Sequence, residues 1–213
     1  MMKLGLQLLA PFLVCAVVLA PAESNAGIEF SAHEIKTLTN GGLVIHPLPG
    51  SGENSVVAGT SFVLIDAPPE VVWRAIQDVP VWTHIFPNTS SSKVMAVSGG
   101  TKAVKMRVGN AIIKVGFYLT AVFDQEKMNF TFSLNKKKPH DIDEARGWMR
   151  LLPQPGGKTL VVFSALVRTP FGLLIKLMGN KVIGWIEHRM LIAPKRLKEW
   201  VEGPNGVKYR SYP

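Results

Sequence analysis

Twelve residues, FVLIDAPPEVVW (Phe62–Trp73), carry the chain from an extended segment into a helix. The pair Pro68-Pro69 cannot continue a strand ladder, but proline is well tolerated in the first turn of a helix. We therefore expect a strand over Ser55–Asp66 and a helix over Pro69–Asp78.

Residues that end or begin helices and strands also lie on either side of this stretch. Downstream, Pro80 forces a break, and Val81–Pro87 is expected to form a second short helix. Upstream, the turn residues Thr39–Gly42 tolerate the positive φ angles of a tight turn and precede a strand that starts at Leu43–Ile45. The pattern predicts an N-terminal extension over residues 27–54 that contains a hairpin.

The middle of the chain alternates between apolar and polar residues. This period of two is typical of antiparallel strands with one buried face and one wet face. With the hairpin-permissive turns between them, the alternation predicts about six antiparallel strands, and it is clearest in Lys102–Val108, Ile113–Phe123, Met128–Leu134, Arg146–Leu151 and Val161–Arg168.

The last long element has helical periodicity. A helix is expected from about Phe171 to Glu202, because apolar residues recur there at spacings of four and once of three. Pro194 removes one backbone donor and crowds the preceding turn, so it should kink or divide this helix near Met190.

These elements, in this order, resemble the START-like (SRPBCC) superfamily of helix-grip domains, in its polyketide cyclase/dehydrase and lipid-transport branch. The resemblance rests on Phe62–Trp73, on Asp78, Trp82 and Pro87 after it, and on Gly147–Pro153 and Gly157–Val162. It implies an α+β fold in which a curved antiparallel sheet wraps around a long C-terminal helix, with two short helices after the first core strand. The START-like domain would then span residues 55–203, followed by a C-terminal tail over residues 204–213.

The resemblance also implies a hydrophobic cavity between the sheet and the C-terminal helix. Such a cavity would bind a lipid, an isoprenoid or a similar hydrophobic small molecule, for transfer or sequestration. Methionine repacks easily and phenylalanine presents a broad apolar surface, so inward residues of these types suit an adaptable lining. The expected ligand-binding residues are Phe86, Met106, Phe117, Leu119, Phe130, Phe132, Met149, Phe163, Met178 and Val182.

The first 26 residues read as a secretory signal peptide. Lys3 gives a short positive region, Leu4–Leu19 is mostly apolar, and small residues run from Ala20 to a cleavage site after Ala26. An uncleaved membrane anchor is the alternative. After cleavage the protein would be periplasmic or secreted, and it would contain no cysteine, because the single cysteine is Cys15.

The amino-acid composition and the net charge limit the fold classes and the kinds of binding partner. Apolar residues make up 47% of the 213 and charged residues 18%, so the chain can bury a core and is a poor candidate for disorder or a coiled coil. The net charge of +9 suits an anionic partner. We expect peripheral contact with an anionic membrane through Lys136–Lys138, with Phe171–Lys176 inserting, and no nucleic-acid partner, since export and the absence of a recognised binding module argue against one.

Two other functions remain open. A cyclase or dehydratase acting on a bound polyketide-type substrate would use His84 or Arg146 as its polar group, but the chain carries no familiar catalytic motif and no cofactor or metal is expected. The titratable cluster His140–Arg146 is better explained as a solvated loop. The third possibility is an interaction module whose interior is filled by its own side chains.

Overall fold

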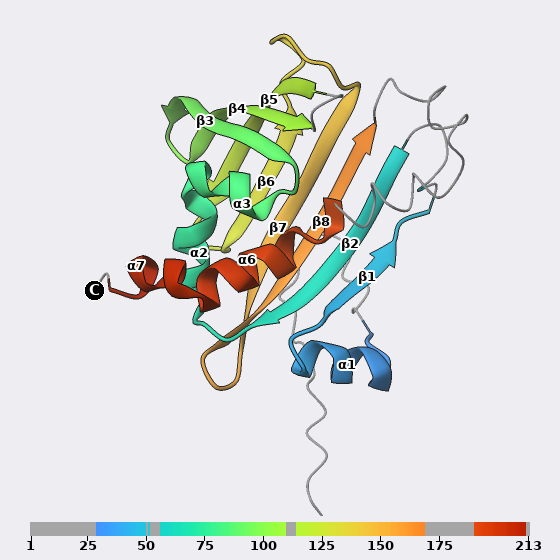
Figure 1. Cartoon of the computed structure of the whole chain (residues 1–213), viewed down its shortest axis with the longest axis vertical. Coiled ribbons are helices and arrows are strands. Elements are labelled where there is room, and N and C mark those ends of the chain that lie inside the picture. The colour runs from blue at the N-terminus through green and yellow to red at the C-terminus, as the bar shows by residue number, and fades with distance from the viewer. Residues whose placement is uncertain (1–28, 50, 52–55, 110–113, 169–189, 212–213) are drawn as a thin grey trace, which may run out of the picture.

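A computed structural model describes residues 29–49, 51, 56–109, 114–168 and 190–211. Within these ranges, eight strands form one antiparallel sheet in the order β1-β2-β8-β7-β6-β5-β4-β3. The sheet curves, and α2, α3 and α6 lie across its concave face (Figure 1), which confirms the expected α+β architecture. The strands are β1 Leu43–Pro47, β2 Val56–Ile65, β3 Thr89–Ser98, β4 Thr101–Gly109, β5 Lys114–Asp124, β6 Asn129–Leu134, β7 Glu144–Gln154 and β8 Lys158–Arg168.

The two short helices follow β2, as the prolines predicted. Helix α2 spans Pro69–Gln77, and the 3₁₀ turn η1 (Val79–Val81) leads directly into α3 (Trp82–Ile85). The buried indole of Trp82 donates a hydrogen bond from Nε1 to the Ile76 carbonyl at 2.8 Å. This bond fixes α3 against α2, and it thereby fixes the part of α3 that reaches the sheet.

Five of the strands correspond to the alternating stretches, and their register explains the alternation. Val104 faces Leu119, Met106 faces Phe117, and Val108 faces Val115 across β4 and β5. Directly opposed residues share a face of the sheet, so these apolar side chains all lie on its concave side. Strand β3, at the edge, did not stand out in the sequence pattern.

The described part of the C-terminal helix begins at Met190. Residues 190 and 191 are helical, Ile192 lies in a turn, and α6 runs over Ala193–Glu202. The interruption falls just before Pro194, as expected. Leu191, Leu197 and Val201 are completely buried, so this segment presses its apolar stripe against the sheet and α2. The remainder of the predicted helix, residues 171–189, lies outside the described residues.

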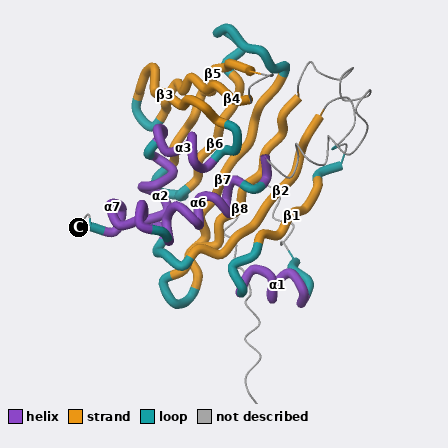
Figure 2. The backbone as a smooth tube through the Cα atoms, viewed as in Figure 1, coloured by secondary structure: helices purple, strands orange, loops and turns teal. Residues whose placement is uncertain are grey.

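Both ends of the described chain are folded. The N-terminal segment forms α1 (Ala32–Thr39), a helix that the sequence reading did not include, and β1 joins β2 to extend the sheet. At the other end, the expected tail forms η2 (Pro204–Gly206) and α7 (Val207–Arg210). Figure 2 shows α7 next to α2 at the end of α6, and Arg74 of α2 donates from Nε to the Tyr209 carbonyl at 2.8 Å.

Candidate ligand cavity

A cavity of about 260 Å³ lies between the concave face of the sheet, α3 and Met190, the first described residue of the last helical segment. Its lining comes from all strands from β3 to β8 and from the loop that follows α3. The described lining residues are Trp82, Phe86, Pro87, Asn88, Thr89, Met106, Val108, Val115, Phe117, Leu119, Phe130, Phe132, Ile142, Ala145, Phe163, Ala165, Val167 and Met190.

The alternation of large and small residues across β6, β7 and β8 explains why space remains. One cross-strand row holds Phe130, Met149 and Phe163, three large side chains that fill the interior. The row two residues along holds Phe132, with Gly147 and Ala165 beside it. Because two of its three members are small, that row leaves volume between the sheet and the helices above it.

Aromatic rings form the inner wall of this space. Phe130 and Phe132 stack with their centroids 5.6 Å apart, and Phe132 and Phe163 stack at 6.3 Å. Trp82 of α3 lies 5.2 Å from Phe130, ring centre to ring centre. The result is a broad, rigid and apolar surface of the kind that binds flat or extended hydrophobic molecules.

Seven of the ten predicted ligand-binding residues line the cavity: Phe86, Met106, Phe117, Leu119, Phe130, Phe132 and Phe163. Met149, between Phe130 and Phe163 in the filled row, does not line it. Met178 and Val182 lie outside the described residues. Whether these side chains touch a ligand stays a prediction.

Several lining residues were missed by the sequence reading. Val108, Val115, Ala165 and Val167 belong to the inward sets of the alternating strands, so the same pattern contained the signal for them. Ala145 of β7 and Met190, which belongs to the apolar stripe of the last helix, also had such a signal. The other missed residues come from short or irregular segments: Trp82, Pro87, Asn88, Thr89 and Ile142. In such irregular segments no periodicity indicates which side chain points inward.

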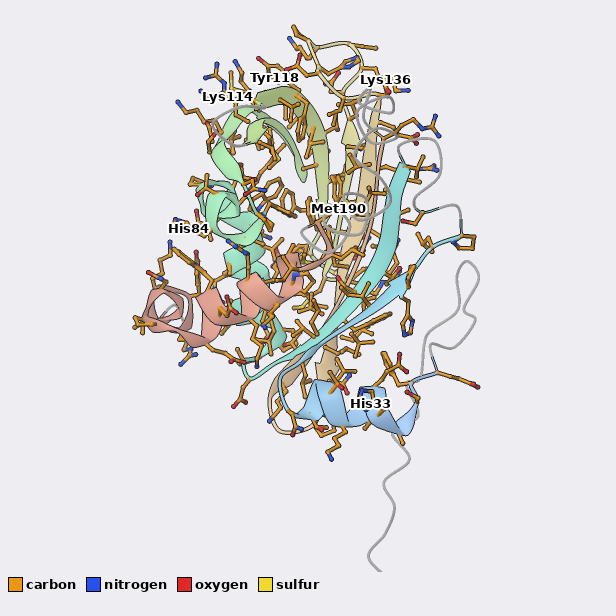
Figure 3. The ribbon with its side chains drawn as sticks, turned by 45° about the vertical axis from the view of Figure 1, so that its right-hand side comes forward. His33, His84, Lys114, Tyr118, Lys136 and Met190 are labelled. Atoms are coloured by element: carbon orange, nitrogen blue, oxygen red, sulfur yellow. The ribbon has the colours of Figure 1, made fainter. Side chains whose placement is uncertain are left out.

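The polar groups suggested for catalysis lie elsewhere. His84 is exposed on α3, where its ring stacks on that of Trp200 at a centroid distance of 4.5 Å; Figure 3 shows it at the outer edge of the molecule. Arg146 is exposed on β7, and its Nε lies 3.2 Å from a carboxylate oxygen of Glu144. Neither side chain lines the cavity.

Residues 57–200 match the family model described as polyketide cyclase/dehydrase and lipid transport. The chain belongs to this family. A comparison with curated proteins finds no match.

Several solved structures have a similar fold. A protein of Thermus thermophilus is 22% identical with a TM-score of 0.58, over 74% of this chain and 99% of its own. The STAR-related lipid transfer protein of Xanthomonas axonopodis is 12% identical with a TM-score of 0.55, over 76% and 93% of the two chains. The ZhuI aromatase/cyclase of a Streptomyces species is 16% identical with a TM-score of 0.53, over 71% and 98%. At these identities the likeness concerns the fold alone.

One fold can host several chemistries, so the polar groups of the cavity indicate the function better than the fold does. Among the described lining residues no side chain is charged, and only Asn88 and Thr89 are polar. The described titratable groups with a shifted pKa lie outside the lining. One of them is Lys102, beneath α2: burial lowers the pKa of its ammonium group, and the negative charge of Asp78 only partly offsets this effect. Within the described ranges, no cluster of His, Cys, Asp or Glu is arranged to hold a metal ion.

Proposed function

We propose that this protein binds a hydrophobic small molecule, such as a lipid or an isoprenoid, in the cavity and carries or sequesters it. The observation that supports this function is an interior space of about 260 Å³ walled by apolar side chains. Removal of apolar surface from water contributes roughly 25 cal/mol per Å², so binding needs no covalent step.

The direct test is to extract the purified protein with organic solvent and to analyse the extract by mass spectrometry. A single apolar compound, or a narrow class, present in amounts comparable to the protein is the expected result. An extract no different from that of an unrelated protein purified in parallel would argue against the proposal.

We favour a carrier function over a cyclase or dehydratase function, because the polar groups on which the enzyme would depend do not line the cavity. His84 stacks on Trp200, and Arg146 pairs with Glu144 on the solvent-exposed face of β7. A general acid or base has to reach the reacting atoms directly or through one water molecule. Turnover of an added polyketide-type substrate that is lost in both His84→Ala and Arg146→Ala variants would reverse this order.

We also propose that the protein is exported and works in the periplasm or outside the cell. The support is the charged, apolar and small-residue succession in residues 1–26. No helix in the described part of the chain is long and apolar enough to cross a membrane. Intact-mass analysis of full-length protein expressed in a bacterium with two membranes should show a chain that begins after Ala26. A full-length chain retained in the membrane fraction would support an anchor instead.

A basic rim beside the cavity supports peripheral contact with an anionic membrane. Lys136, Lys137 and Lys138 are exposed in the β6–β7 loop, which is tied to β5 by a hydrogen bond from the Asn135 amide to the Tyr118 carbonyl at 2.8 Å. Figure 3 shows Lys114, Tyr118 and Lys136 at one end of the molecule and His33 at the other. Val115, next to Lys114, lines the cavity, so this end brings positive charge close to the ligand site.

Liposome co-sedimentation tests the membrane contact. Replacement of the three lysines by serine should release the protein from anionic vesicles, because each basic residue near such a surface contributes about 1 kcal/mol. Lys36→Ser, at the opposite end on α1, is the matched control and should have little effect. Salt-independent recovery that is equal on neutral and anionic vesicles would exclude this contact.

A further inference from the structure

We propose, on the basis of the carrier function above, that the ligand has an uncharged oxygen head group that hydrogen-bonds to the Thr89 hydroxyl. Thr89 is the first residue of β3, the edge strand beside the cavity, and it lines the cavity.

Thr89 and Ser92 of β3 both lie on the concave face of the sheet, and Thr89 is the one that lines the cavity. Thr89 is opposite Val108 and Ser92 is opposite Met106, and both of these partners line the cavity. Residues three apart in a regular strand point to opposite faces, but the register shifts between Thr89 and Ser91. Such a bulge adds a residue to one strand, and here it turns both side chains toward the concave side.

The two hydroxyls are buried and lack partners. Thr89 is 7% exposed and Ser92 is 6% exposed. Neither side-chain oxygen has a hydrogen-bond partner among the residues that the structure describes. A buried hydroxyl without a partner is unfavourable, and most such groups in folded proteins are paired. Of the two, Thr89 lines the cavity, so its hydroxyl points to a partner that enters with the ligand.

The rest of the lining restricts the head group. Apart from Asn88 and Thr89, the described lining side chains are apolar, and none carries a charge. A carboxylate or an ammonium group would therefore lose its hydration without gaining a counter-charge. A hydroxyl can donate or accept, so it matches a neutral alcohol or a carbonyl. The ligand class is an apolar body with a neutral hydroxyl or carbonyl group, rather than a pure hydrocarbon or a fatty acid.

Calorimetry with naphthalene, 2-naphthol and 2-naphthoate tests this class, since the three probes share one apolar body. The wild-type protein should bind 2-naphthol more tightly than the other two. The Thr89→Val variant should weaken 2-naphthol binding about five-fold, as expected for a neutral hydrogen bond, and leave naphthalene binding unchanged. Thr89→Val should also raise the melting temperature of the unliganded protein by about 2–4 °C, because it removes an unpaired buried hydroxyl.

Ser61→Ala is the matched control. Ser61 is fully buried on β2 and its hydroxyl also lacks a partner among the described residues, but it does not line the cavity. Its removal should leave the ratio of 2-naphthol to naphthalene affinity unchanged. Equal weakening of both probes by Thr89→Val, or tightest binding of 2-naphthoate, would overturn the inference and leave the carrier function standing. Failure of the wild-type protein to bind any probe would count against the carrier function itself.

Discussion

Gly147 shows how one residue shapes the cavity. A Cβ atom at this position would lie 2.3 Å from the backbone oxygen of Ser164 and 2.6 Å from the ring of Phe132. A backbone oxygen in a paired strand cannot move aside easily. The absence of a side chain at Gly147 thus leaves room for the Phe132 ring to approach the backbone of β7.

Gly147→Ala should therefore destabilise the protein, by about 1–3 kcal/mol in urea unfolding, because the added methyl group overpacks the sheet. Gly116→Ala on β5 is the control, since a Cβ there meets its nearest atom at an ordinary 3.6 Å. We expect that variant to change stability by about 0.5 kcal/mol or less. Equal effects of the two substitutions would show that close packing at Gly147 is not the cause.

The sequence predicted lining residues where the strands are regular. Phe117, Leu119, Phe130 and Phe163 all follow the inward phase of their strands, and all line the cavity. The positions of Thr89 and Ser92 on the concave face could not be predicted in this way, because the bulge in β3 breaks the period of two. The placement of His84 depends on its tertiary contact with Trp200, which is 116 residues away in the chain and leaves no local signal.

At the scale of elements, α7 is fastened to α2 by a polar cluster. Tyr209 Oη and Lys208 Nζ each donate to Asp78 Oδ2 at 2.7 Å. Burial of the Asp78 carboxyl opposes its ionisation, but these hydrogen bonds outweigh burial and lower its pKa below the ordinary value. The cluster therefore stabilises the fold more when Asp78 is charged than when it is neutral.

This gives a pH dependence with a defined sign. Because the pKa of Asp78 is lower in the folded state, its contribution is present above the unfolded value of about 4 and is lost as the pH falls through the folded value. Asp78→Asn should reduce the free energy of unfolding by about 1 kcal/mol at pH 7, with little difference from the wild type near pH 2. Urea titrations at both pH values measure this.

Glu199→Gln on the exposed side of α6 is the control for that experiment, and it should change stability by about 0.5 kcal/mol or less. A deficit of Asp78→Asn that is the same at neutral and acid pH would mean that the lost interaction is packing and not charge.

Most elements could be predicted from the sequence, and the exceptions have physical reasons. The strand-to-helix transition at Pro68-Pro69 and the break before Pro194 follow from the chemistry of proline. Helix α1 had a signal that was overlooked: Ser31 and Glu34 form a capping box, with the Ser31 amide donating to Glu34 Oε2 at 2.8 Å. Strand β3 had no comparable signal, because it is an exposed edge strand with two irregularities in its register.

At the scale of the whole molecule, the sequence predicted the curved sheet and its helices but not whether the interior is hollow. The same inward phenylalanines would suit a filled core and a lined cavity equally well. The difference arises from where small residues align across strands, as Gly147 and Ala165 do beside Phe132. Such alignment depends on register, which period-two patterning does not specify.

A larger side chain at position 165 would fill the cavity, and its effect distinguishes a carrier from a protein whose core is imperfectly packed. Ala165→Leu adds volume where space exists, so the variant should fold and be at least as stable as the wild type. Ala103→Leu is the control: Ala103 lies on β4 beside Val104, whose cross-strand partner Leu119 lines the cavity, and so it points to the opposite face.

The decisive measurement is native mass spectrometry of full-length protein purified without detergent. We predict a one-to-one complex with an apolar molecule for the wild type and for Ala103→Leu, and ligand-free protein for Ala165→Leu. A ligand-free wild-type protein, or a bound molecule that persists unchanged when the cavity is filled, would contradict the claim that this interior space is the binding site.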